Sequence, residues 1–174
     1  ALGFATVRSL VRSGADGLSV RYNIDKLDFH TVETPQGVFT DLGAANYATT
    51  NKTGLPQLPL LRQIISVPVG AQVLPSFSVV LRKTLSLNEQ GVAYPLLPKQ
   101  ESVSKSADLS TLPFVVDREF YNGDAWTNEP SISATEIGYM RGYRLFALDF
   151  APVRYNPFRG EIEVIYSAEV AVQF

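Results

Sequence analysis

Few residues of this chain are of the types that perform catalysis, and those few are poorly arranged for it. The 174 residues include no cysteine and a single histidine, His30, which excludes thiolate catalysis and most pairs of a nucleophile with a histidine base. A Ser–Lys pair exists within Ser104-Lys105-Ser106. A catalytic base must be held within hydrogen-bond reach of its nucleophile, however, and adjacent residues on a loop are poor candidates. We therefore predict that the chain is not an enzyme.

The acidic residues and glycines also lack the spacing of a hydrolase, a metal site or a phosphate site. Glu161 and Glu163 are two positions apart in an alternating segment, so we expect both on the solvated face of a strand rather than across a glycosidic bond. Asp16 and Gly17 mark a turn, because no series of oxygen ligands for calcium follows them. No glycine-rich phosphate loop is present. We expect no cofactor and no bound metal.

Two side chains have surroundings that suit recognition of a partner. Lys105 lies beside Val103, Ser104 and Ser106, in a segment of small residues. An accessible segment with one long cationic side chain is what a peptidase needs in order to recognise a P1 residue. The simpler interpretation is a solvated lysine. Trp126, surrounded by polar residues and glycine, has the character of a sugar-stacking aromatic, and the simpler interpretation is that it anchors a loop.

Composition narrows the class of partner. The formal net charge is −2, from 15 basic and 17 acidic residues, so no broad positive field is available to hold nucleic acid. No run of about 18 apolar residues occurs, so we expect no membrane insertion. The absence of cysteine does not specify a compartment. The first residue is Ala1 rather than Met, which agrees with a removed signal peptide and equally with a trimmed chain.

Alternation of apolar and polar residues, the signature of β-strands, dominates the chain. It is clearest in Glu161–Phe174, which follows the turn-forming segment Tyr155–Gly160 and the aromatic-rich segment Tyr139–Val153. These features predict a long C-terminal β-hairpin. Further strands are predicted at Phe4–Val11, Leu18–Asp25, Lys26–Glu33, Gly37–Asp41, Leu61–Val67, Ser76–Leu87 and Val92–Leu96. The fold class is therefore all-β, an antiparallel β-sandwich or a partly open barrel.

Three features divide this β-rich chain. Between Ile24 and Leu27 the alternation shifts by one residue, which we interpret as a β-bulge. Residues 42–60 read as a surface connection. Residues 98–113 form a polar loop, and loops of such length are usually functional or disordered. The length suits one domain over residues 1–174, with residues 1–17 poorly defined.

Several short passages resemble the prodomains of gingipain-type cysteine peptidases. Gly54–Pro59 (GLPQLP) and Ile64–Ala71 (IISVPVGA) are similar to the passage G-x-P-x-[LV]-P … VPVGA of that family. Ser102–Val115 is similar to the stretch that ends in PFVY in lysine-specific members. Met140–Arg144 (MRGYR) and Ala151–Pro157 (APVRYNP) resemble the family passages MRG-x-R and P-x-[QR]-Y-[ND]-P. The passages occur in the family order and at similar spacing.

This resemblance implies an inhibitory prodomain that assists folding and blocks the active-site cleft of its cognate cysteine peptidase catalytic domain. It also implies secretion through the periplasm to the surface of a Bacteroidetes-type bacterium. In the family a basic loop residue occupies the S1 pocket of the peptidase, and the motif position of that residue falls on Lys105. The inhibitory loop would then be residues 98–113, with Val103, Ser104 and Ser106 beside Lys105. Lysine preference of the partner is implied, and arginine preference stays open.

Two alternatives from other classes also stay open. The first is a secreted β-sandwich module that binds carbohydrate or protein, with Trp126 and the aromatic-rich strand Tyr139–Phe150 as a sugar platform. The second is a structural domain of a surface protein, in which Glu161–Phe174 would pair with the strand edge of a partner.

Overall fold

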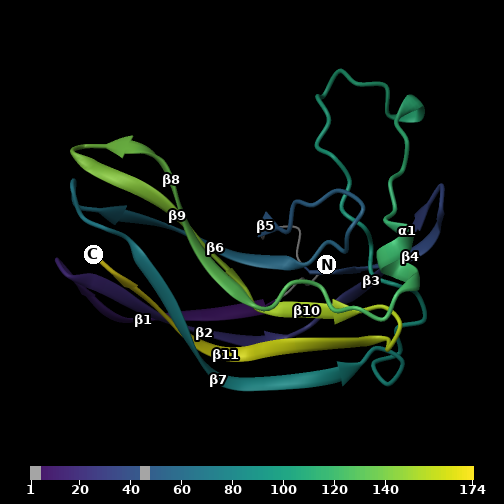
Figure 1. The fold of residues 1–174 in the computed structure, drawn as a ribbon, viewed down its shortest axis with the longest axis horizontal. Coiled ribbons are helices and arrows are strands. Elements are labelled where there is room, and N and C mark those ends of the chain that lie inside the picture. Colours follow the sequence, from purple (N-terminus) through teal and green to yellow (C-terminus); the bar gives the residue numbers. More distant parts are fainter. Residues whose placement is uncertain (1–4, 44–47) are drawn as a thin grey trace.

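The computed structural model describes residues 5–43 and 48–174, with side chains from Leu10 onward except that of Leu109. These residues form an all-β fold, which confirms the predicted class (Figure 1). The strands are β1 (Ala5–Gly14), β2 (Gly17–Lys26), β3 (Phe29–Thr34), β4 (Gly37–Leu42), β5 (Ala48–Thr49), β6 (Pro59–Val67), β7 (Leu74–Ser86), β8 (Ser131–Met140), β9 (Tyr143–Ala151), β10 (Val153–Asn156) and β11 (Glu161–Gln173). The helical elements are a 3-10 turn, η1 (Leu109–Thr111), and a short helix, α1 (Arg118–Asn122).

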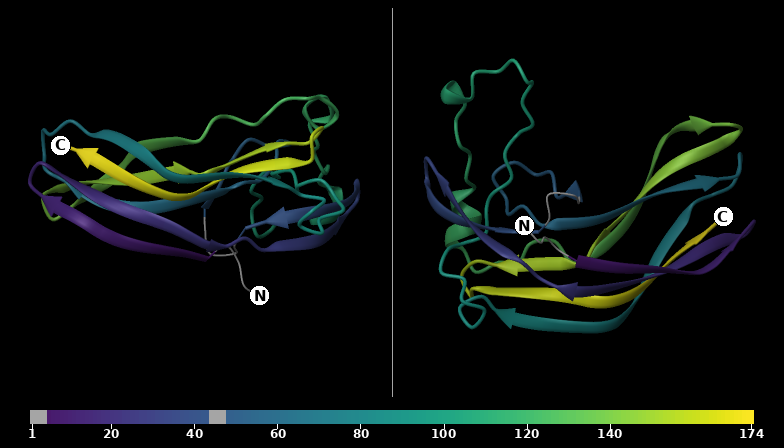
Figure 2. Two further views of the ribbon diagram at one scale, coloured as in Figure 1. Left: turned by 90° about the horizontal axis from the view of Figure 1, so that it is seen from below. Right: turned by 180° about the vertical axis from the view of Figure 1, so that it is seen from behind.

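The strands of the described residues form three sheets, and all their ladders are antiparallel. One sheet has the order β1-β2-β11-β10, with β7 paired to the other edge of β11. A second has the order β5-β6-β9-β8, and β3 pairs with β4 in a separate hairpin. Figure 2 shows that the strands bend together into an open half-barrel rather than closing into a barrel, as the partly open barrel of the prediction implies.

β11 is the central strand of the first sheet and carries much of the core. Its apolar face is buried as predicted, with at most 1% exposure at Ile162, Val164, Ala168, Val170 and Val172. These side chains pack with apolar residues of β2, β6 and β9 in one continuous core. The prediction that the opposite face is solvated is wrong at Glu163, which is only 9% exposed. Arginines from the two flanking strands cover that carboxylate.

The C-terminal hairpin is present, but its paired part is short. β10 and β11 pair from Val153 with Val164 to Asn156 with Glu161, across the predicted turn. The residues before Pro152 belong to β9, which pairs with β6 and β8 in the second sheet. Proline has no N–H to donate to a ladder, and Pro152 stands where the chain passes from one sheet to the other. The carbonyl of Pro152 still accepts a hydrogen bond from Ile165 N at 2.9 Å.

The phase shift after Ile24 coincides with a register shift in the β1–β2 ladder, where Ile24 pairs with Thr6 and Lys26 pairs with Ala5, so Asp25 is the extra residue that the predicted bulge requires. The strand does not continue beyond this point, because β2 ends at Lys26 and β3 starts at Phe29 and pairs with β4. The predicted strand Val92–Leu96 is absent from the described structure. Only isolated bridges occur there, at Leu96 and at Pro98, because prolines 95 and 98 interrupt any regular ladder. The start of the predicted first strand, Phe4, lies outside the described residues.

Candidate functional site

The loop predicted at residues 98–113 projects away from the sheets. It rises from the end of the molecule that carries α1 and the β3–β4 hairpin (Figure 1). Its side chains are exposed from Glu101 to Ser106. A loop that stands clear of the body needs both of its ends held firmly if it is to keep one direction.

The leading end of the loop is held by a run of backbone hydrogen bonds. Leu97 N donates to Thr40 O at 2.8 Å, and Gln57 N donates to Leu97 O at 2.8 Å. Lys99 N donates to Leu55 O, and Gly54 N donates to Lys99 O, both at 2.8 Å. Residues 97–99 are therefore hydrogen-bonded to Thr40 of β4 and to residues 54–57. Residues 54–57, which belong to the predicted surface connection, thus support the loop.

The trailing end of the loop is held by α1. Asp117 Oδ1 accepts from Phe120 N at 3.0 Å and so caps this helix, while Asp117 N donates to Gly54 O at 3.0 Å. Tyr121 on the same helix donates its hydroxyl hydrogen to Leu96 O at 2.6 Å. The two ends of the loop are therefore joined to each other beneath it, through Gly54 and through Tyr121.

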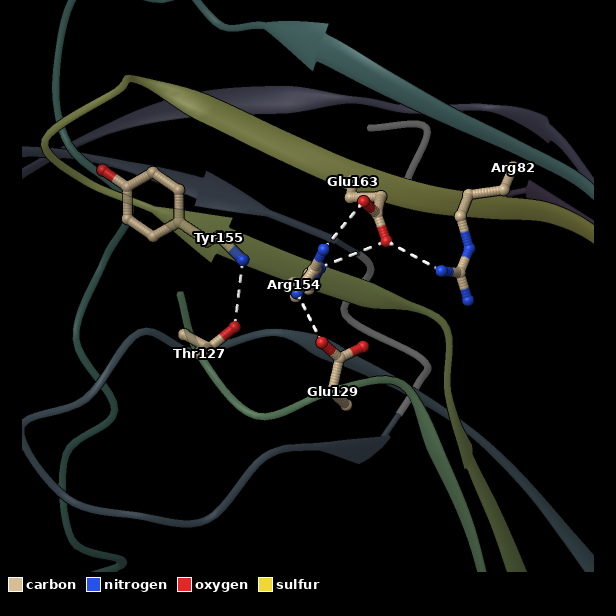
Figure 3. A network of polar contacts seen from close by, with 6 residues as sticks. All are labelled: Arg82, Thr127, Glu129, Arg154, Tyr155 and Glu163. Atoms are coloured by element: carbon tan, nitrogen blue, oxygen red, sulfur yellow. Dashed lines mark hydrogen bonds and ion pairs between the residues drawn. The ribbon is translucent and has the colours of Figure 1, made fainter. Parts of the chain in front are cut away.

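The segment after α1 is joined to the first sheet by a partly buried ionic network (Figure 3). Arg154 on β10 donates from Nε and Nη2 to the two carboxylate oxygens of Glu163 at 3.1 and 3.0 Å, and from Nη1 to Glu129 at 2.6 Å. Arg82 on β7 approaches the other side of Glu163 at 3.3 Å. Hydrogen bonding to Glu163 raises the pKa of Arg154, and partial burial opposes this. Thr127 adds hydrogen bonds to both the N–H and the carbonyl of Tyr155.

Lys105 occupies an exposed turn at the outer part of the loop. Ala107 N donates to Ser104 O at 3.0 Å, and the hydroxyls of Ser104 and Ser106 are hydrogen-bonded at 3.1 Å. Asp108 then accepts from Ser110 N at 3.0 Å and caps η1. The four predicted site residues, Val103 to Ser106, are therefore brought together and presented to solvent.

The remaining candidates are placed in ways that give no catalytic constellation. His30 is exposed on β3 opposite Asp41. Burial raises the pKa of Asp41, and the charge of His30 opposes this. No group of three potential metal-ligating His, Cys, Asp or Glu side chains occurs among the described residues. Nor do the described residues contain a helix with the length and apolar character needed to cross a membrane.

The geometry bears on both alternative functions. The guanidinium of Arg154 lies 4.5 Å from the ring centroid of Trp126, so one face of the indole is already covered. In the aromatic-rich strand, Phe146 and Phe150 are buried in the core and cannot contact a sugar, whereas Tyr139 and Tyr143 are exposed. β11 is paired on both sides, with β7 on one and with β2 and β10 on the other. It therefore offers no free edge to a partner strand.

Tyr121 makes the free energy of unfolding depend on pH in the alkaline range. Burial, followed by the nearby Tyr155 and Asp117, raises the pKa of Tyr121 far above its usual 10. This contribution to stability is complete below pH 10 and declines at higher pH, because the unfolded chain then loses a proton that the folded chain keeps. We expect Tyr121→Phe to cost about 1 kcal/mol at pH 7 through the lost hydrogen bond. The variant should also lose stability less steeply above pH 10. Urea unfolding between pH 8 and 11.5 gives the slope of the unfolding free energy against pH for the wild type and for the variant. Equal slopes would contradict the raised pKa of Tyr121.

Comparison with known proteins agrees with the resemblance seen in the sequence. The family model Propeptide_C25 matches residues 5–174. Lys-gingipain from Porphyromonas gingivalis is 30% identical over 153 residues, which cover 88% of this chain and 9% of that protein. Gingipain R1 from the same organism is 24% identical over 166 residues, which cover 95% of this chain and 16% of that protein. The chain thus spans only a small part of the length of these relatives.

Two solved structures have the same fold. The first, described as giving structural insight into zymogenic latency of gingipain K from Porphyromonas gingivalis, matches with a TM-score of 0.88 and 26% identity, covering 98% of this chain and 97% of that chain. The second is a complex of Porphyromonas gingivalis RgpB pro- and mature domains, with a TM-score of 0.73 and 21% identity, covering 95% of this chain and 83% of that chain. The match to the zymogen structure extends over essentially the whole chain described above.

Proposed function

Because the chain belongs to the Propeptide_C25 family, we propose that it is the inhibitory and folding-assisting prodomain of a gingipain-type cysteine peptidase. It blocks the active-site cleft of that peptidase with the loop at residues 98–113. The observation that carries the proposal is the loop itself, which stands clear of the sheets with Lys105 in an exposed turn while both of its ends are held. The chain acts by binding and performs no catalysis of its own.

Lys105 enters the S1 pocket of the peptidase in this proposal. Its ammonium group would be attracted by an acidic side chain at the base of the pocket, where exclusion of water strengthens the attraction. Backbone groups of residues 103–107 would add hydrogen bonds along the edge of the cleft. A partner with lysine preference fits this side chain, and arginine preference is the alternative.

The turn at Lys105 also suggests how the loop resists cleavage. A peptidase that binds substrate by strand addition takes an extended segment, whereas the Lys105–Ser106 bond lies within a turn closed by Ala107 N and Ser104 O. The bond would therefore be misaligned for attack while the side chain still fills the pocket. Because the free domain already forms this turn, less conformational entropy is lost on binding.

The rest of the domain contributes to binding beyond the loop. A stable protein–protein interface buries about 1,600 Å² in total, which exceeds what one projecting loop supplies. The body of the domain, taken here as one unit over residues 1–174, would add the remaining area. Relatives come from Porphyromonas gingivalis, and secretion with the peptidase through the periplasm to the cell surface is part of the proposal.

An inhibition assay with the unmodified domain tests the proposed function. The purified domain is titrated into a lysine-specific and an arginine-specific gingipain-type peptidase, and the residual activity on small substrates is measured. We expect sub-micromolar inhibition, on the order of 8 kcal/mol or more of binding free energy, with the lysine-specific enzyme more strongly affected. Full activity of both enzymes at micromolar concentrations of the domain would contradict the proposal.

A further inference from the structure

The loop has two legs, residues 98–104 and 108–115, and we call their base, where they meet the body of the domain, the neck. The side chain of Gln100 joins the two legs at the neck in a pairing that resembles one rung of a β-ladder. Gln100 Oε1 accepts from Val115 N at 2.8 Å, and Gln100 Nε2 donates to Val115 O at 2.8 Å. Two residues that exchange both hydrogen bonds form the hydrogen-bonded pair of an antiparallel ladder. Here a side-chain amide replaces one of the two backbones. Nε2 also donates to Pro98 O at 3.2 Å, which fixes the amide to its own leg of the loop.

Beyond this pair, the described part of the loop contains no hydrogen bond or ion pair between its two legs. Its remaining hydrogen bonds are local, within residues 104–107 and within residues 108–111. The legs border a hollow of about 490 Å³ lined by residues that include Val103, Leu112 and Phe114. Val103 and Leu112, which line this hollow from the two legs, are each 42% exposed, so apolar burial between the legs is incomplete. The direction of the outer loop depends on the neck.

We propose that Gln100 is a positioning residue for inhibition, which keeps the two legs together and so aims Lys105 at the peptidase. The inference rests on the proposed function of the loop. Loss of the amide would let the legs separate and would lower the fraction of molecules in the binding-competent form. The apparent inhibition constant rises in inverse proportion to that fraction. Both backbone groups of Val115 can be hydrated in the open form, so the fold itself should lose little stability.

The experiment compares the wild-type domain with Gln100→Ala, Gln100→Glu and a control, Gln72→Ala. Gln72 is exposed and belongs to the connection between β6 and β7. That connection lies at the opposite end of the molecule from the loop (Figure 1). Glutamate at position 100 keeps the acceptor for Val115 N but, when ionised, has no hydrogen to donate to Val115 O. The readouts are the inhibition constant, the midpoint of thermal unfolding, and hydrogen–deuterium exchange of peptides from residues 101–116 without peptidase.

We expect Gln100→Ala to inhibit roughly tenfold more weakly, because its loop must become ordered during binding and this ordering costs free energy. Its loop peptides should exchange faster, its unfolding midpoint should stay near that of the wild type, and Gln100→Glu should be intermediate. Unchanged inhibition by Gln100→Ala would overturn the inference, whether or not exchange increases. If the wild-type domain itself fails to inhibit, the proposed function fails, and the inference falls with it. The exchange data would then show whether the Gln100–Val115 pair orders the loop in the free domain.

Discussion

Replacement of Lys105 by alanine is expected to weaken inhibition of the lysine-specific peptidase by roughly a hundredfold or more, because a central basic anchor often contributes several kcal/mol to an interface. The side chain is exposed in the free domain, and no ion pair to it occurs in the described structure. Its loss should therefore leave the unfolding midpoint unchanged. The inhibition constant, measured with a small substrate over a range of inhibitor concentrations, gives the effect directly.

Two matched variants make the test of Lys105 specific. Lys52→Ala removes an exposed lysine from another loop and should leave inhibition within about twofold of wild type, since isolated surface charges contribute little. Lys105→Arg keeps the charge but changes its shape and hydrogen-bond geometry. This variant should shift the preference of the domain toward the arginine-specific enzyme. Tight inhibition by Lys105→Ala would refute the assignment of Lys105 to the S1 pocket and would leave the prodomain assignment intact.

Replacement of Glu163 by alanine should cost about 3 kcal/mol of unfolding free energy, because removal of one member of a buried ionic group leaves the others without compensation. The side chains of Glu163 and Arg154 are only 11% and 18% exposed, so solvent screens this pair less than a surface pair. The loss corresponds to a decrease of roughly 10 °C in the unfolding midpoint for a domain of this size. Thermal or urea unfolding measures it.

The neighbouring Glu161 provides the control for Glu163. It is on the same strand but is half-buried at the start of β11, and Glu161→Ala should change stability by less than about 0.5 kcal/mol. Glu163→Gln, which keeps the shape and one acceptor, should fall between the two. If Glu163→Ala were as stable as Glu161→Ala, the network of Figure 3 would contribute nothing to the fold.

Alternation within single strands was enough to predict the fold class and the buried face of β11. Successive side chains on a strand point to opposite faces, so a regular apolar pattern identifies the face that packs in the core. The polar composition and the length of the loop around Ser104-Lys105-Ser106 likewise predicted an exposed segment, and the side chains of residues 101–106 are exposed. These inferences depend only on residues that are close together in the chain, and the sequence states such neighbours directly.

The features that the sequence did not predict depend on contacts between residues that are far apart in the chain. Glu163 has the local pattern of a solvated residue, yet strand order places Arg82 and Arg154 beside it. The role of Gln100 depends on Val115, and the support of the loop depends on residues 54–57 and on Tyr121. No local periodicity records which strands become neighbours, because strand order results from packing of the whole core. The sequence therefore determined that this chain is a β-domain with a lysine in a polar loop, and the tertiary structure alone determined which contacts hold that loop.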